Sequence, residues 1–304
     1  MALCVVTREL PGGALDRLRA EHEVEITPAL SERLDSVEGI LSMLTDRIDA
    51  ELIEAAPKLR ALSNYAVGVD NIDVEAATAR GIPVGHTPDV LTGSTADLAV
   101  GLMLAVARRI PEGDRLVRAD DWPEWGPETF IGRDLHGATV GIVGFGRIGQ
   151  AVAQRVEGFE AKVLHTSRSG GTPLPELLER SDFVSLHAPL TPDTRGLIDA
   201  AALERMKPTA FLVNTARGPL VDTGALTAAL HAGTIAGAGL DVTDPEPLPG
   251  DHPLLAAPNL VVVPHIGSDT HTTRRAMADL AVDNLMAGLA GEPMPRCVNP
   301  EVYG

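Results

Sequence analysis

The sequence predicts an α/β protein built on two parallel sheets. Short apolar strands alternate with helical segments along most of the 304 residues. The alternation begins again at Thr139, after a long helical segment that starts near Thr92. A glycine-rich motif also directly follows the first strand of the second series. Such alternation places parallel strands side by side and covers the resulting sheet with helices.

The first series supplies five expected strands and three expected helices. The strands are residues 3–7, 24–26, 39–43, 59–63 and 82–85, and the helices are residues 11–20, 50–56 and 74–80. A longer helix is expected from Thr92 to about Arg109. Ser94 can cap it, with Asp97 three residues on in the pattern of a capping box, and Pro111 is expected to end it.

The second series supplies six expected strands, which is the number that a dinucleotide-binding sheet requires. They are residues 139–143, 161–165, 183–187, 210–214, 236–240 and 260–263, and a helix over 272–289 follows them. Because the second series starts after the long helix and ends near residue 265, we predict two domains. Residues 1–94 and 272–304 form one domain, and residues 95–271 form the dinucleotide-binding domain.

The composition of the chain argues against several classes of binding partner. A formal net charge of -17 argues against nucleic acid and against an anionic membrane surface, both of which attract clustered Lys and Arg. It leaves room for a small anionic substrate, because one or two arginines can dominate a pocket. Two cysteines form no disulfide framework, and the longest apolar run, residues 98–107, is short of the roughly 20 residues that span a bilayer. We expect a cytoplasmic protein without a metal site.

The glycine motif has the spacing G-x-G-x-x-G, from Gly144 through Gly146 to Gly149, between a strand and a helix. The first glycine permits a tight turn, the second lets the backbone approach a pyrophosphate, and the third lets helix and strand pack closely. The helix N-terminus adds free N–H groups and a favourable dipole. The alternative is a glycine-rich turn without a ligand, but the strand–helix–strand context favours a dinucleotide site.

The end of the next strand bears on the choice of cofactor. An acidic residue about 20 positions after the motif would bind the ribose hydroxyls of NAD. No Asp or Glu lies between Glu160 and Glu176, and the turn holds Ser167, Arg168 and Ser169 instead. Hydroxyls and a guanidinium suit a 2′-phosphate, so the sequence favours NADP(H), with NAD(H) possible.

Arg217, Glu246 and His265 each follow a strand of the second series. Ligands of such sheets bind at the carboxyl ends of the strands. Hydride addition to a 2-oxo acid needs a cation for the carboxylate and ketone, and an acid to protonate the nascent alkoxide. Arg and His suit these tasks, and a Glu beside the His keeps it protonated and oriented. Each residue alone could be structural or solvated, but together they indicate a catalytic set.

The chain resembles the D-isomer-specific 2-hydroxyacid dehydrogenases. The segments that carry the resemblance are 140–149, 214–218, 239–248 and 264–268, with 65–70 and 87–91 in the first series. The resemblance implies two doubly wound parallel-sheet lobes, a flavodoxin-like substrate lobe and a Rossmann cofactor lobe, with a cleft between them. It also implies a homodimer.

The resemblance assigns roles to individual residues. Arg217 would bind substrate, Glu246 would be the acid of the dyad, and His265 would be the proton donor and a substrate contact. Val67 and Gly68 would offer backbone N–H groups to the substrate carboxylate. The further residues expected to contact the cofactor are Arg147, Ile148, Pro189, Thr215, Asp241, which would bind the nicotinamide carboxamide, and Gly267.

Within the family, the chain is most similar to the glyoxylate/hydroxypyruvate reductase branch, which tends to use NADPH. Residues 240–249 and 291–295 carry this similarity, as do Trp122 and Trp125, the second of which would either reach a neighbouring subunit's pocket or simply pack at an interface. Two alternatives stay open: a non-catalytic NAD(P)-sensing scaffold of the corepressor type, and a D-2-hydroxyacid dehydrogenase with another substrate.

Overall fold

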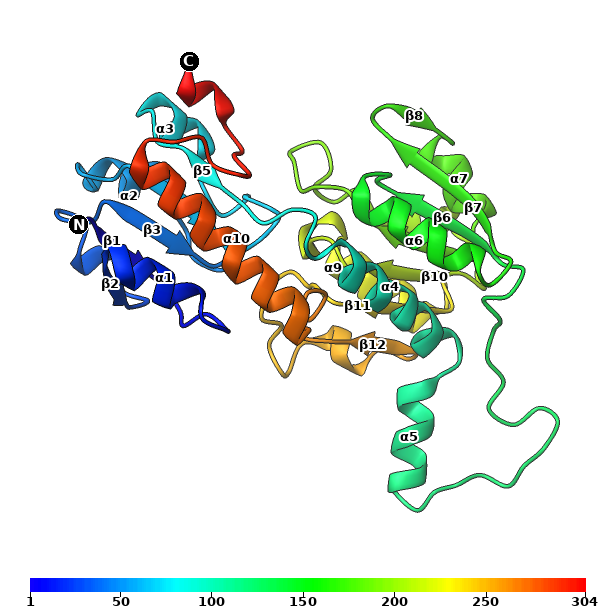
Figure 1. Cartoon of the computed structure of the whole chain (residues 1–304). Helices are drawn as coiled ribbons and strands as arrows, with labels where there is room; N and C mark the ends of the chain where they lie inside the picture. The colour runs from blue at the N-terminus through cyan, green and yellow to red at the C-terminus, as the bar shows by residue number, and fades with distance from the viewer. The chain divides into compact units, whose positions relative to one another are not determined.

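The computed structural model describes all 304 residues, and they divide into two compact units. The first unit comprises residues 1–91 and 269–304, and the second comprises residues 92–268. Each unit is built on a sheet of mainly parallel strands flanked by helices, which confirms the predicted α/β fold class (Figure 1). No helix of the chain is both long enough and apolar enough to cross a membrane.

The sheet of the first unit has five parallel strands in the order β2-β1-β3-β4-β5. The strands are β1 (Leu3–Val6), β2 (Glu23–Ile26), β3 (Gly39–Ser42), β4 (Ala61–Asn64) and β5 (Val84–Gly85). This is the flavodoxin-like order. The chain places β2 on one side of β1 and then β3 on the other side, so the direction in which strands are added reverses between β1 and β3. In open α/β sheets the carboxyl ends of the strands at such a reversal border the ligand crevice.

Helices cover both faces of this sheet. They are α1 (Ala14–Glu21), α2 (Ala50–Ala55), α3 (Val74–Ala79) and α10 (His271–Ala290), with short 3-10 turns η1 (Leu30–Glu32) and η4 (Pro300–Tyr303). α10 packs on β3, β4 and β5 with α1 beside it (Figure 1). Ile53 of α2 and Ala77 of α3 are buried in the core on the opposite face, against Ile40 and Leu62. Successive side chains of a strand point to opposite faces of the sheet, so apolar residues of the strands contribute to a hydrophobic core on each face.

The sheet of the second unit has seven strands in the order β12-β11-β10-β9-β6-β7-β8. They are β6 (Thr139–Val143), β7 (Lys162–Ser167), β8 (Gly170–Gly171), β9 (Phe183–Leu186), β10 (Phe211–Asn214), β11 (Gly237–Leu240) and β12 (Leu260–Val262). Six strands are parallel and correspond to the six expected ones. β8, which the sequence did not predict, pairs antiparallel with β7 as a short hairpin. The order reverses between β6 and β9, where a dinucleotide-binding sheet holds its ligand.

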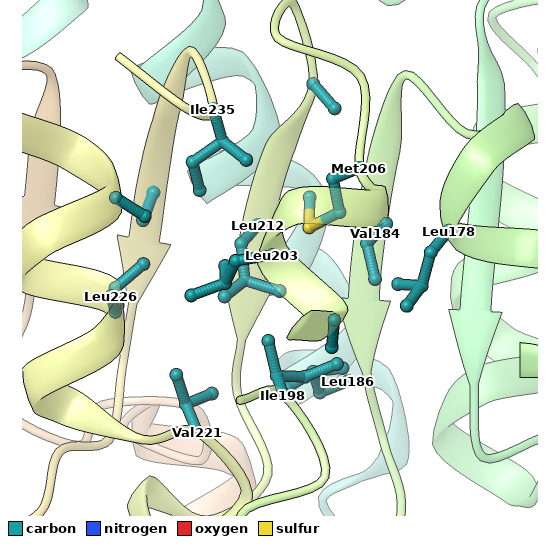
Figure 2. Close-up of a cluster of buried hydrophobic side chains, with 14 of the residues drawn as sticks. Leu178, Val184, Leu186, Ile198, Leu203, Met206, Leu212, Val221, Leu226 and Ile235 are labelled. Atoms are coloured by element: carbon teal, nitrogen blue, oxygen red, sulfur yellow. The ribbon is translucent and has the colours of Figure 1, made fainter. Parts of the chain in front are cut away.

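Helices also cover both faces of the second sheet. α4 (Thr92–Ala107) and α6 (Arg147–Glu157) pack on one face, and α7 (Leu174–Arg180), α8 (Ala200–Arg205) and α9 (Thr223–Ala232) pack on the other, with 3-10 turns η2 (Gly218–Leu220) and η3 (Pro253–Ala256). Figure 2 shows the buried cluster on the face that α7, α8 and α9 cover, to which Leu203 of α8, Leu226 of α9 and Leu212 of β10 belong. This packing fixes the ends of β9, β10 and β11.

The segment after α4 differs from the expectation. α4 ends at Ala107, and a second helix, α5 (Ile110–Arg118), begins directly beyond it, so Pro111 starts a helix instead of ending one. Proline is tolerated in the first turn, where the missing N–H would have no helical partner. α5 buries no residue, and Figure 1 shows it projecting from the second sheet, followed by a long segment without regular structure.

α4 starts at Thr92 as expected, but the predicted cap is wrong. The helix begins at Thr92, so Ser94 lies inside its first turn and not at the cap position. Asp97 instead forms an ion pair with Arg155 of α6, with 2.6 Å between Oδ1 and Nε. This pair joins the two helices that cover one face of the second sheet.

Candidate active site

The glycine turn after β6 has the form that a pyrophosphate requires. Gly144 has a φ of 94°, and a Cβ there would lie 2.5 Å from the backbone nitrogen of Ala188. A Cβ on Gly149 would lie 2.2 Å from the Gly144 carbonyl oxygen. A Cβ on Gly146 would meet nothing within 4 Å, and no side chain caps α6 there. The first and third glycines are therefore needed for packing, while the second leaves an open approach to the helix N-terminus.

The other expected residues of this turn lie at the start of α6. Arg147 is exposed at the first helical position, and Ile148 is partly buried and packs against the core beneath. Phe145, between the first two glycines, stacks on His165 of β7 with 3.9 Å between the ring centroids. The turn is thus supported from the strand beside it.

The hairpin between β7 and β8 carries the three residues expected to recognise a 2′-phosphate. The hydroxyls of Ser167 and Ser169 are hydrogen-bonded at 2.9 Å, and Ser167 also donates to the Gly170 carbonyl at 3.0 Å. Arg168 lies at the exposed tip and has no hydrogen-bond or ion-pair partner in the chain. Its guanidinium is therefore not engaged in an ion pair within the chain.

Two further expected cofactor residues lie after β9 and β10. The Thr215 side chain is buried, and its hydroxyl has no hydrogen-bond partner. A buried hydroxyl without a partner costs about 1–3 kcal/mol, so a polar ligand group at this position would be favoured. Pro189 is exposed, and its carbonyl oxygen accepts a hydrogen bond from the Thr194 hydroxyl at 2.7 Å. Together with the glycine turn, these residues fit a dinucleotide.

Asp241, at the end of β11, holds the loop that follows β12. Its carboxylate accepts hydrogen bonds from the backbone N–H groups of Ile266 at 2.6 Å and Gly267 at 2.9 Å, and its carbonyl accepts one from the N–H of His265 at 2.9 Å. Burial raises the pKa of Asp241 above its usual range, and the two backbone hydrogen bonds oppose that rise. A Cβ on Gly267 would lie 3.0 Å from the Asp241 carboxylate, so this loop closely encloses the acid.

Glu246 and His265 form a hydrogen-bonded pair. His265 Nδ1–H donates to Glu246 Oε1 at 2.6 Å, which leaves Nε2 for another partner. Burial raises the pKa of Glu246, but the hydrogen bond and charge of His265, with the charge of Arg217, outweigh burial and bring that pKa below its usual range. Glu246 is therefore ionised near neutral pH and stabilises the protonated imidazole.

Arg217 follows β10 and is held by a fully buried asparagine. Asn214 donates from Nδ2 to the Arg217 carbonyl at 2.8 Å and accepts from the Ala216 N–H at 3.0 Å. A Cβ on Gly218 would lie 1.9 Å from the Thr243 carbonyl oxygen, so the Arg217 loop packs directly on the loop that leads to Glu246. Since β10, β11 and β12 are adjacent and parallel, their carboxyl ends bring all three candidate catalytic residues together.

In the first unit, Val67 and Gly68 lie in the loop after β4. Their backbone N–H groups have no hydrogen-bond partner in the chain. A cavity of about 800 Å³ lies at the same edge of this sheet. Residues that follow β1, β3 and β4 line it, including Leu10, Met43 and Tyr65, together with residues around the start of α10. The edge therefore has both unpaired donors and space for a ligand.

Asn64 and His86, which reasoning from the sequence missed, bond to this loop. Asn64 is fully buried at the end of β4 and donates to the Gly68 carbonyl at 2.9 Å. His86 Nδ1 donates to the Val67 carbonyl, also at 2.9 Å. Asn64 could have been found from the sequence, because an amide follows a predicted apolar strand there. No local pattern marks His86, because its hydrogen bond is to a residue 19 positions away in the chain.

The family profile described as "D-isomer specific 2-hydroxyacid dehydrogenase, NAD binding domain" matches residues 100–267. A glyoxylate reductase of Pyrococcus furiosus is 48% identical over 320 aligned residues, covering 98% of this chain and 95% of the relative. A crystal structure of a Thermus thermophilus protein has a TM-score of 0.91 and 51% identity, covering 97% of this chain and 99% of that one. An NADPH-dependent glyoxylate/hydroxypyruvate reductase from Sinorhizobium meliloti, crystallised with NADP and malonate, has a TM-score of 0.89 and 35% identity, covering 98% and 97%.

Proposed function

Because the chain belongs to the D-isomer-specific 2-hydroxyacid dehydrogenase family, we propose that it uses NADPH to reduce small 2-oxo acids of the glyoxylate/hydroxypyruvate class to 2-hydroxy acids, with the D configuration where the product is chiral. That it is a nicotinamide-dependent dehydrogenase follows from the family and from relatives that match nearly the whole chain. The observation that carries the proposal is the hydrogen bond between His265 and Glu246, with Arg217 on the adjacent strand end.

The second unit holds the cofactor in this proposal. Gly144, Gly146 and Gly149, with Arg147 and Ile148, surround the pyrophosphate. The buried Thr215 hydroxyl and Pro189 line the cofactor further along. Asp241 and Gly267 would contact the nicotinamide end of the cofactor. The Asp241 carboxylate also fixes the loop that holds His265. The bound dinucleotide supplies the hydride.

The chain's own residues handle the charge that develops on substrate. The N–H groups of Val67 and Gly68 bind the carboxylate, and Arg217 binds the carboxylate and polarises the ketone. Negative charge grows on the ketone oxygen as the carbonyl carbon is reduced. His265, protonated and oriented through its Nδ1 by Glu246, donates a proton from Nε2 to that oxygen. In the reverse direction, neutral His265 accepts the proton from the hydroxy acid.

NADPH is the proposed cofactor because of the β7–β8 hairpin. Arg168 lies exposed at the turn without a carboxylate partner, and two serine hydroxyls flank it. A guanidinium and hydroxyls form charge-assisted bonds with a 2′-phosphate, which NADH lacks. The acid that would bind the ribose hydroxyls of NAD is absent from residues 161–175.

We also propose that the enzyme has a substrate-binding domain of residues 1–94 and 272–304 and a cofactor-binding domain of residues 95–271, whose bounds lie within three residues of those of the two compact units. The chain is proposed to act as a homodimer through α5 and the segment after it. Five of the seven large apolar side chains that are exposed lie there, namely Ile110, Val117, Trp122, Trp125 and Ile131. Exposed apolar side chains gathered in this way indicate a protein interface. The cytoplasmic location stays a prediction.

A spectrophotometric screen tests the function. Oxidation of NADPH and of NADH would be followed with glyoxylate, hydroxypyruvate, pyruvate and phenylpyruvate. The products of the last three, which are chiral, would be assigned as D or L isomers. We expect the highest kcat/KM with NADPH and with glyoxylate or hydroxypyruvate. Better turnover of phenylpyruvate than of hydroxypyruvate would assign another substrate, and NADPH binding without any turnover would favour the scaffold alternative.

A further inference from the structure

We propose that His86 is a positioning residue that orients the Gly68 N–H toward the substrate carboxylate. The inference rests on the proposed function, in which the Val67 and Gly68 N–H groups bind that carboxylate. Two neighbouring anchors, the Thr87 backbone and the Asn64 side chain, fix the peptides on either side in the same way.

The carbonyl groups of the loop are each held by a hydrogen bond. The Ala66 carbonyl accepts one from the Thr87 N–H at 2.8 Å. The Val67 carbonyl accepts from His86 Nδ1 at 2.9 Å, and the Gly68 carbonyl accepts from Asn64 Nδ2 at 2.9 Å. Three successive carbonyls are therefore anchored on the protein side of the loop.

Peptide planarity transmits this anchoring to the N–H groups. These peptide bonds are trans, and in a trans peptide the C=O of one residue points opposite to the N–H of the next. Anchoring the Ala66 carbonyl directs the Val67 N–H away from the protein, and anchoring the Val67 carbonyl directs the Gly68 N–H in the same way. The absence of any partner for these two N–H groups agrees with that orientation.

The His86 anchor is itself firmly held. Its backbone N–H donates to the Arg296 carbonyl at 3.2 Å, and its carbonyl accepts from Asn284 Nδ2 at 2.9 Å. Asn284 is fully buried on α10 and also accepts from the Arg296 N–H at 2.9 Å. Because a carbonyl oxygen can only accept, the Nδ1 atom of His86 carries a proton in this arrangement.

The Asn64 anchor belongs to a second buried network. Its Nδ2 also donates to Asn71 Oδ1 at 3.0 Å, and its Oδ1 accepts from the Ser42 hydroxyl at 3.1 Å. Asn71 donates in turn to the carbonyls of Met43 at 3.0 Å and Asp46 at 2.9 Å. Hydrogen bonds thus connect the loop to β3 through Asn64 and to the residue after β5 through His86. Only the hydrogen bond from His86 holds the peptide group that carries the Gly68 N–H.

The test compares three variants by steady-state kinetics and by crystallography. His86→Leu removes the donor, while His86→Asn keeps an amide nitrogen the same number of bonds from Cα as Nδ1. Asn299→Leu is the matched control, because Asn299 is also buried in the first unit and binds the backbone of Ile82 and Val84 without touching the loop.

We expect His86→Leu to raise the KM for glyoxylate roughly tenfold, as for one lost hydrogen bond to a charged group, with kcat and NADPH affinity changed by less than about twofold. His86→Asn should restore the KM, and Asn299→Leu should leave it unchanged even if thermal stability falls. An unchanged KM in His86→Leu, or a His86→Asn variant as impaired as His86→Leu, overturns the proposal.

Crystal structures separate this proposal from the proposed function. In His86→Leu the peptide between Val67 and Gly68 should be rotated or disordered, and in His86→Asn it should match the wild type. A peptide that keeps its orientation in His86→Leu contradicts the positioning role whatever the activity. A wild-type enzyme that reduces no 2-oxo acid contradicts the proposed function, while the orientation of the peptide still decides the role of His86.

Discussion

The Nδ1 atom of His265 lies 2.6 Å from Oε1 of Glu246, and the N–H of His265 is bonded to the carbonyl of Asp241 at 2.9 Å. The imidazole is therefore fixed both through its ring and through its backbone, with Nε2 available for substrate. An acid–base group held in this way needs no reorganisation when a proton is transferred.

His265→Ala should lower turnover at every pH, by roughly 10²–10⁴ for the loss of a general acid. The dissociation constant of NADPH should change little, because His265 is not assigned to phosphate binding. The measurements are kcat with glyoxylate and a fluorescence titration of NADPH, with His231→Ala, a histidine in the last turn of α9, as control. Near-normal turnover in His265→Ala would show that another group donates the proton, and His271 would be the first to examine.

Arg168→Ala should weaken NADPH binding by about 1.5–3 kcal/mol and leave NADH binding almost unchanged, since only NADPH presents a 2′-phosphate. Dissociation constants for both cofactors would be measured by titration. Arg205→Ala is the control, because Arg205 is an exposed arginine on α8 paired with Glu179. Equal losses for the two cofactors, or a wild type that prefers NADH, would show that the hairpin does not select the 2′-phosphate.

The double variant Ile110→Asp/Val117→Asp should sediment as a monomer, whereas the wild type should sediment as a dimer. Charges on α5 would have to be buried in the proposed interface, and α5 packs on no core that they could disrupt. Leu255→Asp is the matched control, because Leu255 is another exposed apolar side chain, 44% accessible, outside this segment. A monomeric wild type, or a double variant that stays dimeric, would exclude an α5 interface.

The sequence was sufficient to predict the fold class and six strands of the second sheet, because those strands are apolar runs separated by helical segments. It missed β8, whose two residues are glycines and which exists only through pairing with β7. It missed α5 because that helix buries no side chain, and because a proline such as Pro111 is compatible both with the end of a helix and with a first turn.

For the candidate site, the sequence likewise predicted the residues that follow strands but not the contacts between distant parts of the chain. Residues that directly follow strands, such as Arg217 and His265, were identifiable because parallel strands bring their carboxyl ends together. Asp241 also holds the backbone of Ile266 and Gly267. No local pattern predicts this role, because Ile266 lies 25 residues away in the chain. Likewise, the anchoring of the Val67 carbonyl by His86 emerges only when β4 and β5 pair.

The pH dependence of reduction tests the catalytic pair most directly. The pKa of Glu246 lies below its usual range, so Glu246 is ionised throughout the pH range in which an imidazole titrates, and its charge favours the protonated form of His265. Reduction needs that protonated form and should therefore fall on the basic side of the profile.

The decisive measurement is the rate of glyoxylate reduction by NADPH against pH, for the wild type and Glu246→Gln. Gln keeps the size of the side chain but removes the negative charge beside His265. We predict that the basic limb of the profile moves to lower pH in Glu246→Gln. A basic limb at the same pH in both proteins would contradict the assignment of His265 and Glu246 as the acid–base pair.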